Sequence, residues 1–481
     1  MPKIEMCLKE NIQNIKNTFH DTSDLIIRNI KAGCDGSLEM NVVYLDGIID
    51  VDLIQDYVVK PLLEPFKAED SNESLNELIM ERIVESADVK TTTHYQELTD
   101  AIVQGNTVLL INGIREGIII PSPKWAERSV EASIGERSVR GPQIGLTEKM
   151  KTNINLIRGS LKTPDLCVET VEIGSTSPTA VSILYIEGTV DKGILKEVKK
   201  RLNSLNIKYV LSERVVEDVL EGKPKTFFSR LRHSERMDGA VSSLFEGRVV
   251  VIVDGYPFAI IAPALFIDFI QAPDDYHISM GRFTSRIIRF IAFLIGVYLP
   301  AVYIALANFH KDDLPDKISK AIISNDELLP TFWEIAILLF LVRILVDVSF
   351  RLPQSAVILV SLIGTIVIGE TAVTAKLIHP VSLIVIGITA LSSFLGANRG
   401  LVGPDATLRI VFLLTANFFG FNGIIIGTTI LMLYMGSLKS IGVPYLSPII
   451  PFKMKELKDT FYREDLQRLT NSKHSYTEDK G

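Results

Sequence analysis

Hydrophobic and polar positions divide the chain into two unlike parts. Residues 1–281 mix charged and apolar positions as a soluble protein does, whereas residues 283–438 consist mainly of Ile, Leu, Val, Ala, Gly and Phe. A helix needs about 20 mostly apolar residues to cross the hydrocarbon layer of a membrane. Four segments meet or approach this length: 287–308, 356–374, 380–397 and 410–438. The pattern predicts a soluble region, then an α-helical transmembrane domain over 283–438 and a basic cytoplasmic tail over 439–481.

A fifth apolar segment, 332–350, contains three charged residues, Glu334, Arg343 and Asp347. Arg343 and Asp347 are four residues apart and could pair on one helical face, which lowers the cost of burying them in a membrane. They could equally mark a helix end at the membrane interface. The two residues are therefore a candidate intramembrane ion pair, with the interfacial interpretation left open.

Basic residues beside the predicted spans indicate an orientation. Short cytoplasmic flanks of membrane helices are enriched in Lys and Arg, and Arg282, Arg286 and Arg289 precede the first span. Residues 1–30 contain no apolar segment typical of a signal peptide. We therefore expect the N-terminal region to stay in the cytoplasm. The basic tail should lie on the same side, which requires an even number of crossings.

The segment 410–438 bears on that number because it is longer than one crossing requires. Gly420, Asn422 and Gly423 interrupt it, so it could form two short or re-entrant pieces. Otherwise one of the earlier segments does not cross. The prediction is a domain of about four to six membrane segments.

One pattern occurs twice in the soluble region. The segment 44–50 resembles 185–191: a strand pattern ends at a glycine, and an Asp follows as a candidate helix N-cap. A helix of mixed polarity comes next in each copy, over 51–63 and 192–205. The same order of strand, glycine and helix could also occur twice by chance.

Each copy closes with two apolar strands around a turn dipeptide, Asn112-Gly113 in the first and Asp254-Gly255 in the second. These dipeptides suit the positive φ angles of a tight hairpin. We therefore predict two tandem α/β subdomains, residues 1–145 and 146–272, related by internal duplication.

Four arginines lie near one another towards the end of the first subdomain: Arg115, Arg128, Arg137 and Arg140. A cluster of guanidinium groups could hold an anion or an acidic surface of a partner protein. Several glutamates lie among them, so a solvated network of salt bridges is the alternative interpretation.

Composition and motifs exclude several classes of function. The formal charge of −7 is spread over mixed acidic and basic positions, which argues against binding nucleic acid. Three cysteines lie far apart without a CxxC pair, so neither a disulfide framework nor a zinc site is expected. No nucleotide-binding or hydrolase motif occurs. We expect no enzymatic activity, no cofactor and no metal.

Small side chains recur at helical spacing in the segment 356–374 and just beyond it: Ser361, Gly364, Ile368, Thr371 and Ala375. Such a stripe lets helices pack closely, and it could also line a water-filled pore if several copies surround an axis. Glu370, near the end of the segment, is either a carboxylate at the membrane interface or part of a cation-attracting ring in an oligomer.

Several long motifs resemble the A subunits of spore germinant receptors of the GerA family. They include Glu136-Arg-Ser-Val-Arg-Gly-Pro142, the segment from Ser234 to Arg248, and Pro273-Asp-Asp-Tyr276. The resemblance extends from Ser23 to the basic tail.

This resemblance implies a receptor with two further subunits: a permease-like B subunit that binds the nutrient, and a lipoprotein C subunit. It places the complex in the inner membrane of a bacterial spore, where nutrient binding releases monovalent cations and starts germination. It also implies that the A subunit is a homo-oligomer that forms or gates a cation-conducting path. The alternative is a non-conducting scaffold or transporter-type subunit that docks the permease-like subunit, although a transporter is expected to show inverted repeats among its spans.

Overall fold

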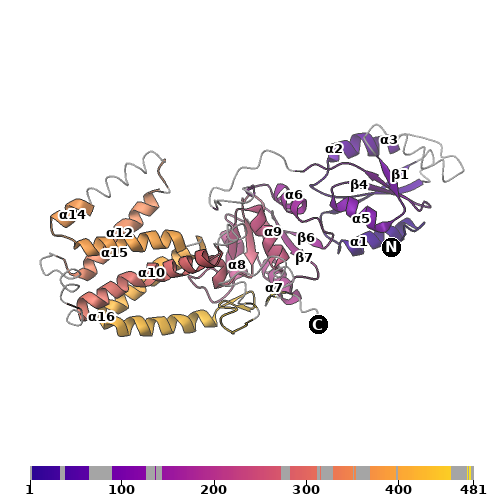
Figure 1. The fold of residues 1–481 in the computed structure, drawn as a ribbon. Coiled ribbons are helices and arrows are strands. Elements are labelled where there is room, and N and C mark those ends of the chain that lie inside the picture. The colour runs from indigo at the N-terminus through magenta and orange to yellow at the C-terminus, as the bar shows by residue number, and fades with distance from the viewer. Residues whose placement is uncertain are drawn as a thin grey trace.

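The chain is elongated, with two β-sheet units towards one end and a bundle of helices at the other (Figure 1). The computed structural model describes residues 3–32, 38–63, 89–125, 136, 144–271, 282–310, 315, 329–349, 351–353, 369–396, 399–454, 456, 474 and 476–477. Within these ranges, the second sheet unit lies between the first unit and the helices.

The first unit is an antiparallel sheet covered by helices, with the strand order β1-β2-β4-β5-β3. Its strands are β1 (Leu25–Ala32), β2 (Leu38–Leu45), β3 (Lys90–Thr92), β4 (Thr107–Ile111) and β5 (Gly117–Ile120). Its helices are α1 (Leu8–Thr18), α2 (Val51–Ile54), η1 (Gln55–Val59), α3 (Lys60–Leu63) and α5 (Tyr95–Val103).

The second unit is also an antiparallel sheet, and its order, β6-β7-β9-β10-β8, repeats that of the first sheet strand for strand. Its strands are β6 (Leu166–Ile173), β7 (Thr179–Ile186), β8 (Arg232–Ser234), β9 (Val249–Val253) and β10 (Ala259–Ala262). Its helices are α6 (Met150–Ser160), α7 (Lys192–Asn203), α8 (Arg214–Glu221), α9 (Met237–Phe245) and η2 (Phe266–Phe269).

Local contacts also repeat between the units. The Asn112 side chain accepts a hydrogen bond from the backbone N–H of Leu8, the first residue of α1 (3.3 Å), and the Asp254 carboxylate accepts one from Met150, the first residue of α6 (3.1 Å). Each side chain thus satisfies a backbone donor that the start of a helix leaves unpaired. The first helix of each unit is therefore held by the loop after its central strand.

These loops are longer than the tight hairpin predicted from sequence. They comprise residues 112–116 and 254–258. The first residue of each loop uses its side chain to accept a hydrogen bond from the start of a helix. Gly113 and Gly255 have φ angles of 87° and 90°, in the left-handed region that glycine adopts without strain. The predicted helix N-cap is present at Asp191, whose carboxylate accepts from Gly193 (2.8 Å) and Ile194 (2.9 Å).

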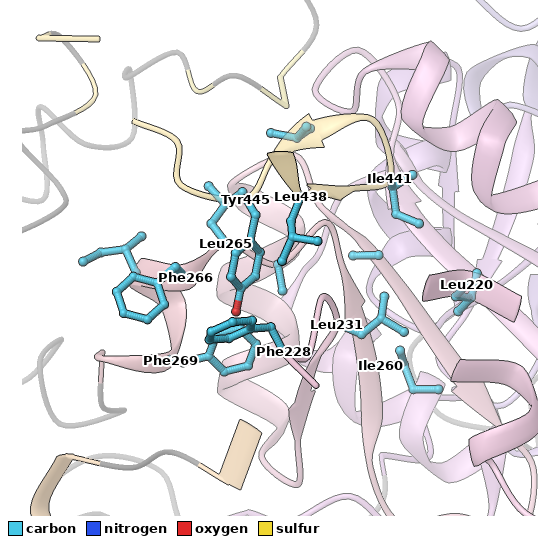
Figure 2. Packing of buried hydrophobic residues seen from close by; sticks show 14 of the residues in the cluster. Leu220, Phe228, Leu231, Ile260, Leu265, Phe266, Phe269, Leu438, Ile441 and Tyr445 are labelled. Atoms are coloured by element: carbon cyan, nitrogen blue, oxygen red, sulfur yellow. The ribbon is translucent and has the colours of Figure 1, made fainter. Parts of the chain in front are cut away.

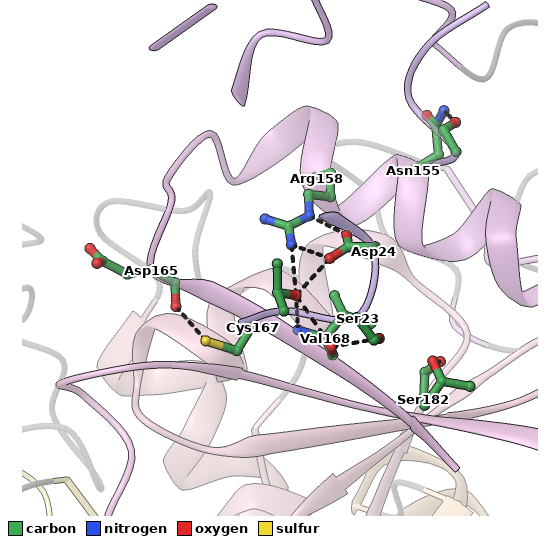
Figure 3. Close-up of polar contacts among 11 residues, drawn as sticks. Ser23, Asp24, Asn155, Arg158, Asp165, Cys167, Val168 and Ser182 are labelled. Atoms are coloured by element: carbon green, nitrogen blue, oxygen red, sulfur yellow. Dashed lines mark hydrogen bonds and ion pairs between the residues drawn. The ribbon is translucent and has the colours of Figure 1, made fainter. Parts of the chain in front are cut away.

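Helix α6 joins the two units through a buried ion pair (Figure 3). The Arg158 Nε and Nη2 atoms donate to the two carboxylate oxygens of Asp24, each at 2.9 Å, and the side chains are 2% and 8% exposed. Thr22 extends the contact, since its hydroxyl donates to Asp24 (2.6 Å) and accepts from the Val168 N–H (2.8 Å). The first unit is thereby fastened to α6 and to β6 of the second unit.

The helical region comprises α10 (Arg282–Phe309), α12 (Thr331–Ser349), α14 (Thr371–Thr374), α15 (Pro380–Gly396) and α16 (Arg399–Ser437), followed by the hairpin strands β11 (Lys439–Ser440) and β12 (Val443–Pro444). Among the described residues, two helices have the length and hydropathy of a membrane span, over Ser285–Phe309 and Gly400–Ser437, and α15 is a shorter apolar helix. The number of crossings stays a prediction.

Helix α16 departs from helical geometry at Gly420, where φ is 58° and ψ is −141°. This position belongs to the interruption expected within 410–438. A Cβ atom at Gly420 would lie 3.1 Å from the ring of Phe309 at the end of α10. Glycine is needed here both for its positive φ and for the close approach of the ring.

Replacing Arg158 by Ala is expected to lower the free energy of unfolding by about 3–5 kcal/mol, because Asp24 is left buried without a counter-charge. The matched control is Lys151→Ala on the same helix, whose 2.7 Å pair with Asp46 is exposed and should contribute about 0–1 kcal/mol. Thermal unfolding of the full chain in detergent measures both. Equal melting temperatures for the two variants would show that the buried pair does not stabilise the contact between the units.

Candidate functional site

The structure places only part of the candidate pore stripe and of the arginine cluster. Six of these residues lie outside the described ranges: Ser361, Gly364, Ile368, Arg128, Arg137 and Arg140. Glu370 and Thr371, at the start of α14, are exposed, and so is Arg115 in the loop between β4 and β5. The candidate pore stripe and the arginine cluster therefore both stay predictions.

Arg343 and Asp347 do pair along α12. The Arg343 Nη2 and Asp347 Oδ1 atoms are 3.3 Å apart, and the side chains are 55% and 52% exposed. Such exposure places the pair on the outer surface of the described helices. Its position within a membrane remains a prediction.

A more deeply buried ion pair lies between three helices and was not predicted from sequence. Arg409 of α16 donates to the Asp405 carboxylate (2.5 Å), to the Ser393 hydroxyl of α15 (2.5 Å) and to the Gly296 carbonyl of α10 (2.7 Å). Asp405 and Arg409 have the same four-residue spacing as the predicted pair, but in the sequence they look like the polar flank of the apolar segment 410–438. Their spacing was the sequence feature that could have indicated an ion pair.

Glu334 is the second buried charge that the sequence pattern did not assign to a site. It lies in the first turn of α12 with 2% exposure. Its carboxylate accepts hydrogen bonds from the Ser382 hydroxyl (2.7 Å) and from the His379 backbone N–H (3.3 Å), at the start of α15. The Tyr303 hydroxyl of α10 lies 3.2 Å from Ser382, so this carboxylate ties three helices together.

These two buried charges hold neighbouring helices together through their hydrogen bonds. Within the described residues, no group of three or more His, Cys, Asp or Glu side chains could hold a metal ion. The structure instead concentrates its buried contacts at the place where the second sheet meets the helices. We call this place the junction; it consists of Arg248, η2, the ends of α10 and α16 that face the second unit, the loop 226–231, the segment 438–446 and Tyr476.

One hydrophobic core runs through the junction without interruption. It includes strands of the second sheet, η2, parts of α10 and α16, and the hairpin after α16. Figure 2 shows Phe228, Phe266, Phe269 and Leu438 gathered around Tyr445. The Phe266 ring lies 5.8 Å from the ring of Phe293 in α10 and 6.3 Å from that of Tyr445. Since such cores are close-packed, a displacement on one side is passed to the other.

The start of α16 packs directly on η2. A Cβ atom built on Gly400 would clash with the ring of Phe269, which is itself buried. Only glycine permits this separation between the two elements. Gly403, less than one turn further on, has no neighbouring atom within 4 Å of such a Cβ.

A buried ion pair fixes η2 to the sheet. The Arg248 guanidinium bonds both oxygens of Asp268, at 2.5 and 2.8 Å, and both side chains are buried. Burial alone would raise the pKa of Asp268, but the charge of Arg248 and its hydrogen bonds outweigh burial and hold that pKa below its ordinary value. The pair is therefore ionised, and β9 and η2 cannot separate without exposing or isolating a charge.

The hairpin after α16 is hydrogen-bonded to the same region. The Ser440 hydroxyl donates to the Arg230 carbonyl (2.5 Å) and accepts from the Ala264 N–H (3.0 Å). The Phe266 N–H donates to the Tyr445 carbonyl (3.0 Å). The end of α16 is thus joined to the second unit through backbone as well as side-chain contacts.

A short piece of the C-terminal tail completes the junction. Tyr476 is buried, its ring centroid lies 4.7 Å from the Arg248 guanidinium carbon, and its hydroxyl accepts a hydrogen bond from Arg248 (3.1 Å). The Asp191 N–H donates to the Tyr476 carbonyl (3.3 Å), at the start of α7. Burial raises the pKa of Tyr476 well above its ordinary value, so the phenol stays neutral. The predicted basic tail gave no sign of this contact.

Comparison with known proteins gives one family over almost the whole chain. The family model described as Bacillus/Clostridium GerA spore germination protein matches residues 13–475. Spore germination protein KA of Bacillus subtilis (strain 168) is 34% identical over 463 residues, 96% of this chain and 85% of that protein. Spore germination protein GerLA of Bacillus cereus is 32% identical over 96% of this chain and 94% of its own length.

Two further comparisons concern the membrane and the soluble region. The uncharacterized membrane protein YfkQ of Bacillus subtilis (strain 168) is 30% identical over 98% of this chain and 92% of that protein. The crystal structure of the N-terminal domain of the A subunit of the Bacillus megaterium spore germinant receptor GerK3 is 32% identical, covers 55% of this chain and 98% of that chain, and has a TM-score of 0.44. The chain is therefore a membrane protein of the Bacillus/Clostridium GerA spore germination protein family.

Proposed function

We propose that this chain is a germinant-receptor A subunit that converts the binding of a nutrient into the initiation of spore germination, and that the junction carries the signal from the soluble units to the helices. The observation that supports the proposal is the hydrophobic core shared by the second sheet, α10 and α16. A shared core behaves as one rigid body, because interiors are close-packed and not continuously deformable.

The proposal assigns the remaining parts of the receptor to other chains. The nutrient is bound by a permease-like B subunit, and a lipoprotein C subunit completes the complex in the inner membrane of the spore. Family membership supports this set of partners. Arg286 and Arg289, at the end of α10 beside the second unit, support a cytoplasmic location for the soluble units.

We further propose that the subunit acts as a homo-oligomer that forms or gates a cation-conducting path. Ser361, Gly364, Ile368 and Thr371 would line it or pack its helices, with Glu370 at its mouth. The exposure of Glu370 and Thr371 supports this role, since both are available to face neighbouring copies. The matching strand orders of the two sheets support an origin of the soluble units by internal duplication.

Gly400→Leu is expected to impair nutrient-triggered germination, because the added side chain pushes α16 away from Phe269 and overpacking costs about 1–3 kcal/mol. Gly403→Leu is the matched control, since an added Cβ there meets no neighbouring atom. Germination rates of spores that carry each variant are compared at equal amounts of the subunit in the spore membrane. Normal germination with Gly400→Leu would remove this contact from the signalling route.

Tyr476→Ala is expected to destabilise the junction by about 3–5 kcal/mol, as the loss of a large buried aromatic side chain does. Tyr476→Phe keeps the ring over Arg248 and should cost only about 1 kcal/mol for the lost hydrogen bond. Thermal unfolding of the full chain in detergent separates the two effects. If the Phe variant loses as much stability as the Ala variant, the ring is not what holds the tail.

Cation flux through proteoliposomes tests the conducting path. Nutrient-dependent flux is expected when the chain is reconstituted with its B and C partners, and Gly364→Leu or Thr371→Val should alter it, because pore-lining side chains set the width and polarity of a path. A correctly assembled complex without flux would favour the non-conducting scaffold.

A further inference from the structure

Two loops beside the end of α16 expose apolar side chains next to lysines. The first, residues 223–227, exposes Phe227 between β8 and α8, together with Lys223 and Lys225. The second, residues 449–454, follows the hairpin after α16. Its exposed residues are Ile449, Ile450, Phe452, Lys453 and Met454. Together we call these two loops the collar.

The first loop is attached to the last turns of the membrane helix. The Tyr434 hydroxyl, near the end of α16, donates to the Thr226 hydroxyl (2.8 Å), and its ring stacks on that of Phe227 with centroids 6.1 Å apart. Phe227 is nevertheless 42% exposed. Its side chain therefore lies beside the last turns of the apolar helix α16.

The second loop is tied to the first through buried aromatic rings. The ring of Phe228, adjacent to Phe227, lies 6.0 Å from that of Tyr445, and the chain passes from Tyr445 directly into the second loop. Phe452 and Met454 are then 70% and 75% exposed. Large apolar side chains exposed this far, and grouped rather than scattered, mark an interaction surface.

The charges of the collar favour one kind of partner. Lys223 and Lys225 are exposed, and neither has an ion pair with a residue in the described ranges. Lys453 lies 3.3 Å from Glu456, so the first loop carries most of the uncompensated positive charge. Aromatic and lysine side chains gather at the interface between a membrane and water, where rings enter the headgroup layer and ammonium groups meet lipid phosphates.

We propose that the collar is a membrane-surface contact: its apolar side chains enter the interfacial layer of the bilayer around α16, and Lys223 and Lys225 bind the headgroups of anionic phospholipids. The contact holds the second unit against the bilayer at the point where the junction meets the membrane. It concerns lipid rather than nutrient, and it is independent of whether the subunit conducts ions.

Tryptophan reporters test the apolar part of the proposal in the full chain. Phe227→Trp and Phe452→Trp are each introduced after the native tryptophans Trp125 and Trp333 have been replaced by Phe. The proteins are reconstituted into vesicles that contain phosphatidylcholine brominated near the headgroup end of its acyl chains. Emission from both reporters should shift to the blue and lose intensity, because bromine quenches only indoles that enter the interfacial layer.

Tyr57→Trp is the matched control, because Tyr57 is a similarly exposed aromatic residue of the first unit, which the second unit separates from the membrane helices (Figure 1). Its emission should not respond to the brominated lipid. Quenching of Trp at positions 227 and 452 that does not exceed quenching at 57 would overturn the proposal. A protein partner or a second copy of the chain would then be the occupant of the collar.

Charge reversal tests the headgroup part. Quenching of the Phe227→Trp reporter should be stronger in vesicles that contain phosphatidylglycerol than in phosphatidylcholine alone, and Lys223→Glu with Lys225→Glu should abolish the difference. Lys9→Glu with Lys90→Glu, two exposed positions in the first unit, should leave it unchanged. A response that ignores both lipid charge and the reversal at 223 and 225 would overturn the assignment to anionic headgroups.

Discussion

A guanidinium and a carboxylate are far less costly to bury in an apolar interior as a pair than singly, and the junction contains one such pair. Arg248 lies immediately before β9, the central strand of the second sheet, and Asp268 lies on the short helix that precedes the membrane helices. Removing either partner isolates a charge in a medium of low polarity. The sheet, the short helix and the ring of Tyr476 therefore stay packed together, because separating them would leave one of these charges buried without its partner.

The two boundaries of the second unit differ in their chemistry. The boundary with the first unit is largely polar, through Asp24, Arg158 and the exposed pair of Lys151 with Asp46. The boundary with the helices is a continuous apolar core. Polar interfaces are typical of domains that move relative to one another. Elements that share one apolar core, such as the second sheet and the helices, move as one body. Under the proposed function, a change in the second unit therefore acts on the helices directly.

Runs of apolar residues predicted most of the helical region. Helices α10, α12 and α15 follow the predicted segments closely, whereas α16 begins at Arg399, before the predicted start at 410. The sequence pattern also indicated both sheet units. The strand order could not be predicted from the sequence, because the pairing of β2 with β4, for example, depends on contacts between residues far apart in the chain. Asp405 with Arg409 and Tyr476 were missed for another reason: each lies in a polar flank, and only the folded chain shows that the flank is buried.

The position of Tyr476 has a consequence for how the protein is made. Its ring packs beside Arg248, yet all the membrane helices lie between these two residues in the chain. Domains tend to fold as the ribosome releases them, N-terminal first. The second unit leaves the ribosome early, but its contact with Tyr476 forms only after the helices have been synthesised and inserted. Completion of the second unit is thereby a readout of finished membrane insertion, and a chain stalled within the bilayer is left with an incomplete second unit.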